Sequence, residues 1–277
     1  MRFCAFVLLT ISFTLTAAAE NFTVVSYNIW NGFNKGSAVQ PGIAWIKAQD
    51  AHVVALQELV GIDATGLAKF AEAWNHPHSA ILKERGYPVG ITSRTPIEVV
   101  ERRMEGMHHG FLHARTAGYD IFVLHLAPGD DRLEVRKREV NILTEILTPL
   151  VQSGTPLIAL GDFNDVSPLD ISDKDRDVSV IQGFLTMGLV DTVHHFAKSN
   201  GRSPRGTYPT RTFTPDVTQQ EHEAKIRRID YIFVTEELNK SVEFVESPRH
   251  PDLDIVSDHY PVVLRFNRKV IAEFDLL

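Results

Sequence analysis

Several apolar runs in this chain end abruptly in acidic, amide or imidazole side chains, and this arrangement limits the folds that the chain can adopt. The runs and the polar residues that follow them are 24–27 with Asn28, 53–57 with Glu58, 156–160 with Asp162 and Asn164, and 253–256 with Asp258 and His259. A buried strand that ends in this way places polar side chains at the rim of a sheet, where α/β proteins carry their chemistry. The pattern therefore predicts an α/β protein with a functional site built from strand ends.

Residues 1–19 have the composition of a secretory signal peptide. Arg2 supplies a positive charge, residues 3–15 are mostly apolar, and three alanines precede Glu20. The apolar run is shorter than a membrane span requires, which disfavours the alternative of an uncleaved anchor. We therefore expect a secreted or periplasmic protein that consists of residues 20–277.

Length, charge and cysteine content narrow the class of the remaining chain. About 258 residues suit one large domain with a well-buried core. The only cysteine, Cys4, lies in the predicted signal peptide, which excludes disulfides, thiolate metal sites and a cysteine nucleophile. The net charge of −7 disfavours a surface designed to hold polyanions over its whole area. We expect a monomer with no obligate protein partner.

Hydrophobic periodicity predicts strands and helices that alternate along the whole chain without a linker. Residues 22–29 and 52–57 are predicted strands, separated by a helix over 38–49, and short strands between 79 and 126 precede a long helix over 130–151. The order favours an α/β four-layer sandwich of two mixed, largely antiparallel sheets flanked by helices. Two long polar stretches, 165–178 and 197–227, are predicted to be loops that face the substrate, with exposed surface loops as the alternative.

The polar residues at the strand ends form an oxygen-rich set with few positive charges. Carboxylate and amide oxygens suit a hard divalent cation, Mg²⁺ first, with Mn²⁺ or Ca²⁺ as alternatives, rather than Zn²⁺. His259 is the candidate base because a neutral imidazole accepts a proton near pH 7, and Asp230 is the candidate partner that orients it. His125, at the end of another predicted strand, is a candidate donor to a phosphate oxygen or a leaving group. The remaining histidines, including His108 and His109, are expected on the surface or in loops.

Seven short motifs occur in an order that resembles the endonuclease/exonuclease/phosphatase superfamily, whose fold is that of deoxyribonuclease I. They are Ser26-Tyr27-Asn28-Ile29-Trp30, Leu56-Gln57-Glu58, Gly90-Ile91-Thr92-Ser93-Arg94, His125-Leu126, Gly161-Asp162-Phe163-Asn164, Arg228-Ile229-Asp230-Tyr231 and Ser257-Asp258-His259. Together they span residues 23–266. The resemblance implies a metal-dependent phosphoric ester hydrolase with its catalytic domain in residues 20–277.

The resemblance also implies roles for individual residues. Glu58 is implied to hold the cation, with Asn28 and Asp258 completing or flanking that site, and Asp162 and Asn164 to contact the nucleophile and the phosphate. Asp230 is implied to orient His259. His125 matches the deoxyribonuclease and sphingomyelinase branches. Trp30 stands where the abasic-site endonuclease branch carries an acidic residue, which disfavours that activity.

Three functions remain open at this point. The first is a phosphodiesterase or nuclease that acts on nucleic acid or another diester by in-line attack of water. The second is a phosphomonoesterase or a sphingomyelinase-like lipid-headgroup hydrolase of the same fold. The third is a non-catalytic module that binds a cation or a phosphate.

Overall fold

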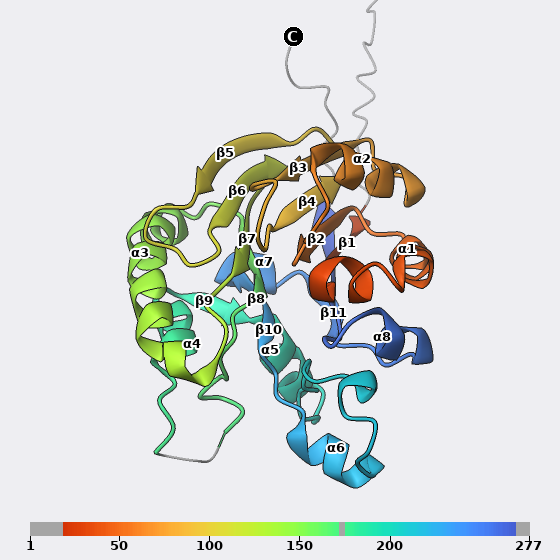
Figure 1. Cartoon of the computed structure of the whole chain (residues 1–277). Helices are drawn as coiled ribbons and strands as arrows, with labels where there is room; N and C mark the ends of the chain where they lie inside the picture. The colour runs from red at the N-terminus through yellow and green to blue at the C-terminus, as the bar shows by residue number, and fades with distance from the viewer. Residues whose placement is uncertain (1–18, 172–174, 270–277) are drawn as a thin grey trace, which may run out of the picture.

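Two six-stranded sheets pack face to face in the computed structural model, which describes residues 19–171 and 175–269 (Figure 1). In spatial order the first sheet contains β11 (Val242–Glu246), β12 (Val262–Lys269), β1 (Ala19–Asn28), β2 (Val53–Gln57), β4 (Gly90–Ser93) and β3 (His78–Ile81). The second contains β5 (Glu98–Arg103), β6 (Phe111–Thr116), β7 (Tyr119–His125), β8 (Leu157–Asp162), β10 (Asp230–Thr235) and β9 (Leu189–Asp191).

Each sheet is antiparallel except for one central pair of parallel strands. These pairs are β1 with β2 in the first sheet and β7 with β8 in the second. Parallel neighbours end at the same edge of a sheet, so Asn28 lies beside Gln57, and His125 lies beside Asp162. The two parallel pairs therefore bring four of the predicted polar strand ends to the sheet edges, and the predicted pair of mixed, largely antiparallel sheets is confirmed.

Helices cover the outer face of both sheets. The helices α1 (Val39–Ala48), α2 (Ala64–Ala73) and α8 (Pro251–Val256) cover the first sheet, and α3 (Leu133–Gln152) and α4 (Ser179–Thr186) cover the second (Figure 1). Three hydrophobic clusters fill the molecule: one between the sheets, and one between each sheet and its helices. The predicted four-layer sandwich is thus present.

The remaining elements are short and lie near the ends of the sheets. They are the helices α5 (Thr192–Ser199), α6 (Gln219–Lys225) and α7 (Glu236–Asn239), and the turns η1 (Trp30–Asn34), η2 (Asp130–Arg132) and η3 (Arg211–Phe213). Among the described residues, no helix is long and apolar enough to cross a membrane. The predicted signal peptide falls almost entirely in residues 1–18, outside the described part of the chain.

Two predictions of local structure were wrong. Residues 253–256, predicted as a strand before Asp258, belong to helix α8, because His250 caps the helix and Pro251 occupies its first position. The predicted polar loop over 197–227 contains the end of α5 and all of α6, which begins at a capping box formed by Thr218 and Glu221. In both cases a local capping signal decides the structure where hydrophobic periodicity is weak.

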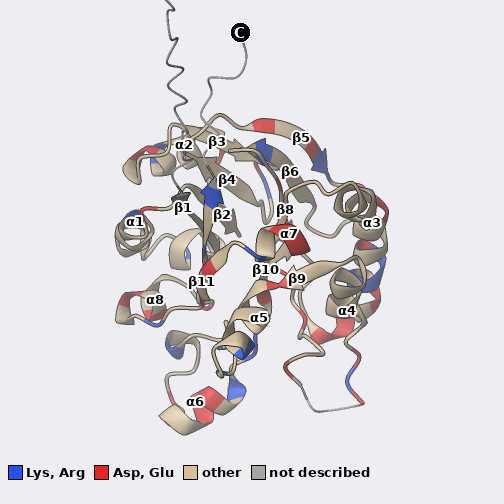
Figure 2. Ribbon diagram, turned by 180° about the vertical axis from the view of Figure 1, so that it is seen from behind, with Lys and Arg blue, Asp and Glu red and all other residues tan. Residues whose placement is uncertain are grey.

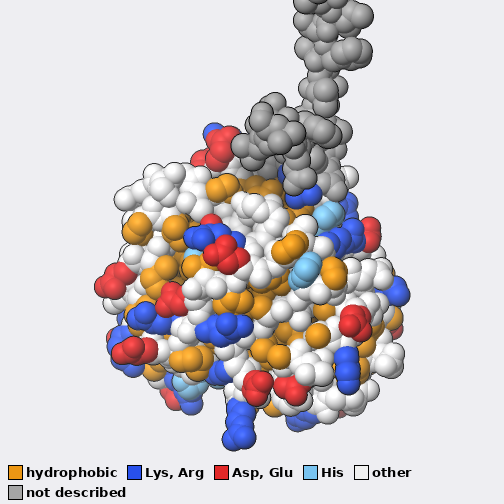
Figure 3. Space-filling view, turned by 90° about the horizontal axis from the view of Figure 1, so that it is seen from above, with side chains coloured by type: hydrophobic (Ala, Val, Ile, Leu, Met, Phe, Trp, Pro, Cys, Tyr) orange, Lys and Arg blue, Asp and Glu red, His pale blue; other side chains and the backbone are white. Residues whose placement is uncertain are grey.

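Charged residues are mixed over the surface. Both basic and acidic residues lie along α3 and α6 (Figure 2), and both signs are interspersed on the face in Figure 3. This arrangement agrees with the prediction that the surface as a whole is not designed to hold a polyanion.

Candidate active site

The predicted site residues come together at one end of the sheets, around a pocket of about 240 Å³. Six of the eight line this pocket: Glu58, His125, Asp162, Asn164, Asp258 and His259. The other two stand behind it, since Asn28 contacts Asp162 and Asp230 contacts His259. These residues are up to 231 positions apart in the sequence (28 to 259), and the two parallel strand pairs and the loop after α8 bring them together.

His259 and Asp230 form the hydrogen-bonded pair that the sequence predicts. His259 Nδ1 lies 2.8 Å from Asp230 Oδ2, and both side chains are buried. Burial by itself lowers the pKa of His259, but the carboxylates of Asp230 and Asp162 outweigh it and hold that pKa well above its usual value. With Nδ1 committed to Asp230, Nε2 is the ring atom left to face the pocket, 3.7 Å from Asp162 Oδ2.

Asp162 is the central carboxylate of the site. Its Oδ2 accepts a hydrogen bond of 2.9 Å from Asn28 Nδ2, and its Oδ1 accepts one of 2.9 Å from the backbone N–H of Asn164. Burial raises the pKa of Asp162 to about 8, against the charge of His259. A buried carboxylate with so little compensating charge is a group that a cation or a bound proton stabilises.

The donors around the pocket fit a divalent cation of the oxygen-binding class. Glu58 and Asp258 offer carboxylates to the pocket, and burial raises the pKa of Asp258. Asp162, Asp230 and His259 also present possible ligand atoms within 4.8 Å of one another, although His259 Nδ1 is already bonded to Asp230. Carboxylate oxygens are the donors that Mg²⁺ and Ca²⁺ prefer.

Asn28 has a different contact pattern from that of a metal ligand. Its Nδ2 donates to Glu58 Oε1 at 3.2 Å as well as to Asp162, and its Oδ1 accepts the backbone N–H of Trp30 at 3.1 Å. In this orientation Asn28 fixes the two carboxylates relative to each other. The prediction is that Asn28 lies beside the cation. In that position its amide group separates the carboxylates of Glu58 and Asp162.

Backbone strain marks two of the site residues. Glu58 has a φ of 60° and Asn164 a φ of 52°, in the left-handed region that few residues other than glycine adopt. Residues 30–36 all have positive φ, and within this left-handed segment the Asn31 N–H donates to Glu58 Oε2 at 2.9 Å. Such conformations persist only where the surrounding structure requires them, and they cluster at functional sites.

His125 reaches the pocket, and a second histidine supports it. His125 Nε2 lies 3.6 Å from Asp162 Oδ2, and burial holds the pKa of His125 well below its usual value. The ring of His109 stacks on it with a centroid distance of 4.3 Å. His109 lies in a loop, which is one of the two placements predicted for it, but it is not on the surface: it is 6% exposed, and burial lowers its pKa to about 3. No sequence signal pointed to this stack, because it depends on how the loop before β6 meets the end of β7.

Helix α3 carries two buried charged residues that hold the pocket loops. Arg136 Nε bonds Asp165 Oδ2 at 3.0 Å, and its Nη1 donates to the carbonyl groups of Ala127 and Gly129. Glu139 accepts the backbone N–H groups of Ala127 and His108. Arginines on an amphipathic helix usually have a solvated side chain, whereas Arg136 is buried. Its contacts show instead that the helix positions both loops of the pocket wall.

Sequence reasoning also missed Tyr208 as a pocket residue. Its ring lies 4.8 Å from that of His259, and it lines the pocket together with Arg176 and Arg227. Arg227 is half exposed, and its Nη1 lies 3.7 Å from Asp130 Oδ1 across the pocket. Its neighbour Arg228 is instead buried in ion pairs with Asp191 and Asp170, so its charge is used inside the protein.

Comparisons with solved structures identify the same fold elsewhere. A 3′ phosphatase (NExo) from Neisseria, bound to a product DNA hairpin, matches with 19% identity over 88% of this chain and 99% of its own, at a TM-score of 0.66. An AP endonuclease from Archaeoglobus fulgidus matches with 17% identity over 88% of this chain and 99% of its own, at a TM-score of 0.65. A comparison with curated protein sequences gives no significant match.

A family model settles the relationship that the fold suggests. The model of the endonuclease/exonuclease/phosphatase family matches residues 25–259. That range contains all eight predicted site residues and every strand of the second sheet, whereas β12 and the first part of β1 in the first sheet lie outside it. The chain belongs to the endonuclease/exonuclease/phosphatase family.

Proposed function

We propose that this protein is a divalent-metal-dependent phosphodiesterase, acting as a nuclease, that hydrolyses its substrate by in-line attack of water. One observation carries the proposal: His259 bonded to Asp230, and Asp162 held by Asn28, face one small pocket. A base with a fixed tautomer beside a positioned carboxylate is what the activation of a water molecule requires. Membership of a family of nucleases and phosphatases supports the same reaction class.

In this mechanism each residue acts through the contact already described. In the neutral form of the ring, which the raised pKa of His259 restricts to higher pH, His259 Nε2 accepts the proton of the attacking water, and Asp230 stabilises the imidazolium that forms. Asp162 and the side chain of Asn164 orient the water and the phosphate, and His125 donates to a non-bridging oxygen or to the leaving group. Tyr208 packs beside His259 and limits the positions open to its ring.

The cation would be held by Glu58 and Asp258, with Asn28 between Glu58 and Asp162. When bound, the cation would neutralise the negative charge of the phosphate, including the charge that develops during the displacement. Mg²⁺ is the ion that we propose, because the donors are oxygen atoms and a phosphate completes such sites well.

Hydrolysis of plasmid DNA and bis-p-nitrophenyl phosphate tests this proposal, with Mg²⁺, Mn²⁺ or Ca²⁺ added to the purified protein. We expect metal-dependent cleavage that disappears in His259→Ala. Glu58→Gln should raise the metal concentration needed for half-maximal activity at least about tenfold, and should weaken Mn²⁺ binding in calorimetry by a similar factor. Full activity of His259→Ala would refute the mechanism.

A second candidate is a phosphomonoesterase that removes a phosphate from the end of a DNA strand. It is favoured by the matching fold of the 3′ phosphatase from Neisseria and by the small volume of the pocket. Comparing the release of phosphate from a 3′-phosphorylated oligonucleotide with internal cleavage of the same strand separates the two activities.

We also propose that the protein is exported, on the basis of the signal-like composition of residues 1–19. Expression in a bacterial host followed by N-terminal sequencing of the extracytoplasmic fraction tests this. A protein that starts at Glu20 is the expected product, and an intact N-terminus in the cytoplasm would contradict it.

A further inference from the structure

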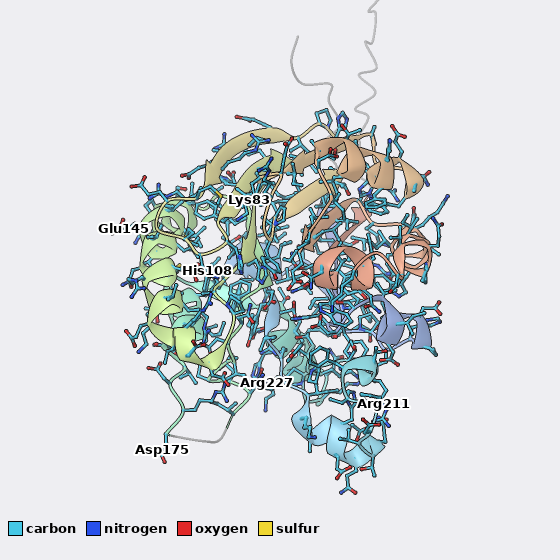
Figure 4. All side chains as sticks on the ribbon, viewed as in Figure 1. Lys83, His108, Glu145, Asp175, Arg211 and Arg227 are labelled. Carbon is cyan, nitrogen blue, oxygen red and sulfur yellow. The ribbon has the colours of Figure 1, made fainter. Side chains whose placement is uncertain are left out.

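A second cavity, of about 510 Å³, lies next to the active site and shares no lining residue with it. Three arginines from separate segments line it: Arg205, Arg211 at the start of η3, and Arg249 before α8. We call this cavity the arginine pocket. Figure 4 shows Arg211 on the side of α6 and α8, while Arg227 lies nearer the centre of the molecule.

The arginine pocket has an excess of positive charge in a chain whose net charge is −7. Its three guanidinium groups face two carboxylates, Glu223 and Asp254. Asp254 already accepts hydrogen bonds from the Tyr260 hydroxyl and from the backbone N–H of Arg211. His222 and His250 also line the cavity, and burial lowers the pKa of His222, so His222 adds little charge at neutral pH. The net charge around this pocket is therefore positive, whereas that of the whole protein is negative.

Two of the arginines keep donors for a ligand. Arg205 is exposed and makes no hydrogen bond or ion pair with the other described residues. Arg211 makes one side-chain bond, of 3.3 Å, from Nη1 to the Thr218 carbonyl group. Arg249 stacks on the Tyr260 ring at 3.7 Å and donates to backbone carbonyl groups, which fixes its position. Partial burial lowers the pKa of Arg249 to about 10, so it stays charged at neutral pH.

A thin wall separates the arginine pocket from the active site. Tyr208 and Arg227 form an isolated bridge in this wall, and Thr207 N–H also donates to the Arg227 carbonyl group. Neighbouring residues face opposite sides: Ile226 and Tyr260 line the arginine pocket, while Arg227 and His259 line the active site. A substrate strand that crosses this wall would therefore pass from the active site to the arginine pocket.

We propose that the arginine pocket is a second phosphate site, which holds a phosphate group of the substrate other than the one that is hydrolysed. The proposal rests on the proposed phosphodiesterase function and narrows its substrate to a strand with at least two phosphates. Arg205 and Arg211 bind the phosphate oxygens, and Arg249 keeps the wall and the charge in place. Guanidinium groups suit this role because their paired N–H donors match the geometry of phosphate.

Binding of a single-stranded oligonucleotide in EDTA tests the proposal without turnover. The Arg205→Ala/Arg211→Ala protein should bind a short thymidine oligonucleotide at least about tenfold more weakly than the unaltered protein. The slope of log K against log salt should also become shallower by about 1, because the contact with one phosphate is lost. Arg205→Lys/Arg211→Lys should recover part of the affinity and the slope.

A matched control removes the same charge elsewhere. Lys69→Ala/Arg138→Ala replaces two exposed cations on α2 and α3 and should change neither affinity nor slope. Equal losses in both double variants would overturn the proposal, since they would indicate only a change in net charge. Weaker binding of inorganic phosphate with unchanged oligonucleotide binding would also overturn it, by assigning the pocket to a free anion.

Kinetics separate this inference from the proposed function. The Arg205→Ala/Arg211→Ala protein should keep its kcat/KM on bis-p-nitrophenyl phosphate, which has one phosphate, and lose at least about tenfold on the oligonucleotide through KM. Absence of hydrolysis of every substrate by the unaltered protein would refute the proposed function alone. Equal losses on both substrates would refute the second phosphate site alone.

Discussion

His259 Nδ1 lies 2.8 Å from Asp230 Oδ2, and neither residue is more than 5% exposed. Asp230 begins β10, and its backbone N–H donates to Thr207 Oγ1 at 3.1 Å, so the carboxylate is held at the strand end. The pair links a strand of the second sheet to the loop after α8, which packs on the first sheet. The geometry of the proposed base therefore depends on how the two sheets are stacked.

Asp230→Asn should reduce kcat on bis-p-nitrophenyl phosphate by roughly 10³- to 10⁴-fold with little change in KM. The amide retains the shape of the carboxylate but favours the wrong tautomer of His259 and no longer stabilises the imidazolium. Steady-state kinetics at saturating metal measure the effect.

The chain offers a matched control for this substitution. His113 Nε2 and Asp120 Oδ1 form another buried histidine–aspartate pair, at 2.6 Å, which does not line the active-site pocket. Asp120→Asn should leave kcat within about twofold while disturbing a similar contact. A comparable loss of kcat in Asp120→Asn would mean that the Asp230 result reports general disruption.

Much of the fold and of the site was predictable because local signals agree with the global structure. Glu58 and Asp162 follow continuous apolar runs, and the parallel strand pairs bring such ends together. His109 and Arg136 were not predictable, because a histidine in a loop and an arginine on an amphipathic helix are usually solvated. Their burial arises from contacts between segments far apart in the sequence, which residue patterns do not encode.

Gly161→Ala should destabilise the fold by more than 3 kcal/mol and abolish activity. A Cβ at this position would lie 1.9 Å from the Leu124 carbonyl oxygen, and the φ of 140° is itself unfavourable for alanine. The β7–β8 pair would have to separate next to Asp162. Urea denaturation measures the change in the free energy of unfolding.

Gly154→Ala is the control that measures the cost of the unfavourable backbone conformation alone. Gly154 has a φ of 75° but no atom within 4 Å of the Cβ position, so its substitution should cost only about 1 kcal/mol. Similar costs for the two variants would show that conformational strain, and not the clash with Leu124, explains the effect.

Arg136→Leu should destabilise the protein by about 3–5 kcal/mol, because it leaves the buried Asp165 carboxylate without its partner. The substitution also frees the loops at Ala127–Gly129 and Asn164–Asp165, so kcat should fall together with stability. Denaturation and kinetics on the same preparation measure both effects. Arg138→Leu, an exposed position on the same helix, should change the free energy of unfolding by less than about 0.5 kcal/mol.

A double variant distinguishes loss of the ion pair from loss of packing. Asp165→Asn removes the unpaired charge, so Arg136→Leu/Asp165→Asn should be less destabilised than the sum of the single changes by at least about 1 kcal/mol. Strict additivity of the two would contradict the role of Arg136 as the partner of Asp165.

His109 should make the stability of the protein fall as the pH drops below about 6.5. Burial lowers the pKa of His109 to about 3 in the folded state, whereas the unfolded chain binds a proton near 6.5. Between these two pH values the unfolded state binds more protons than the folded state. The free energy of unfolding therefore rises with pH across this window, and the protein becomes less stable on acidification.

His109→Phe keeps a ring against His125 and removes the titration, and the His109 Nε2 atom has no hydrogen-bond partner to lose. From pH 7 to pH 5 the unaltered protein should therefore lose about 2 kcal/mol more than the variant, as measured by urea denaturation at both pH values. The same substitution at His195, which is exposed on α5, is the control, and an equal change there would contradict the assignment to His109.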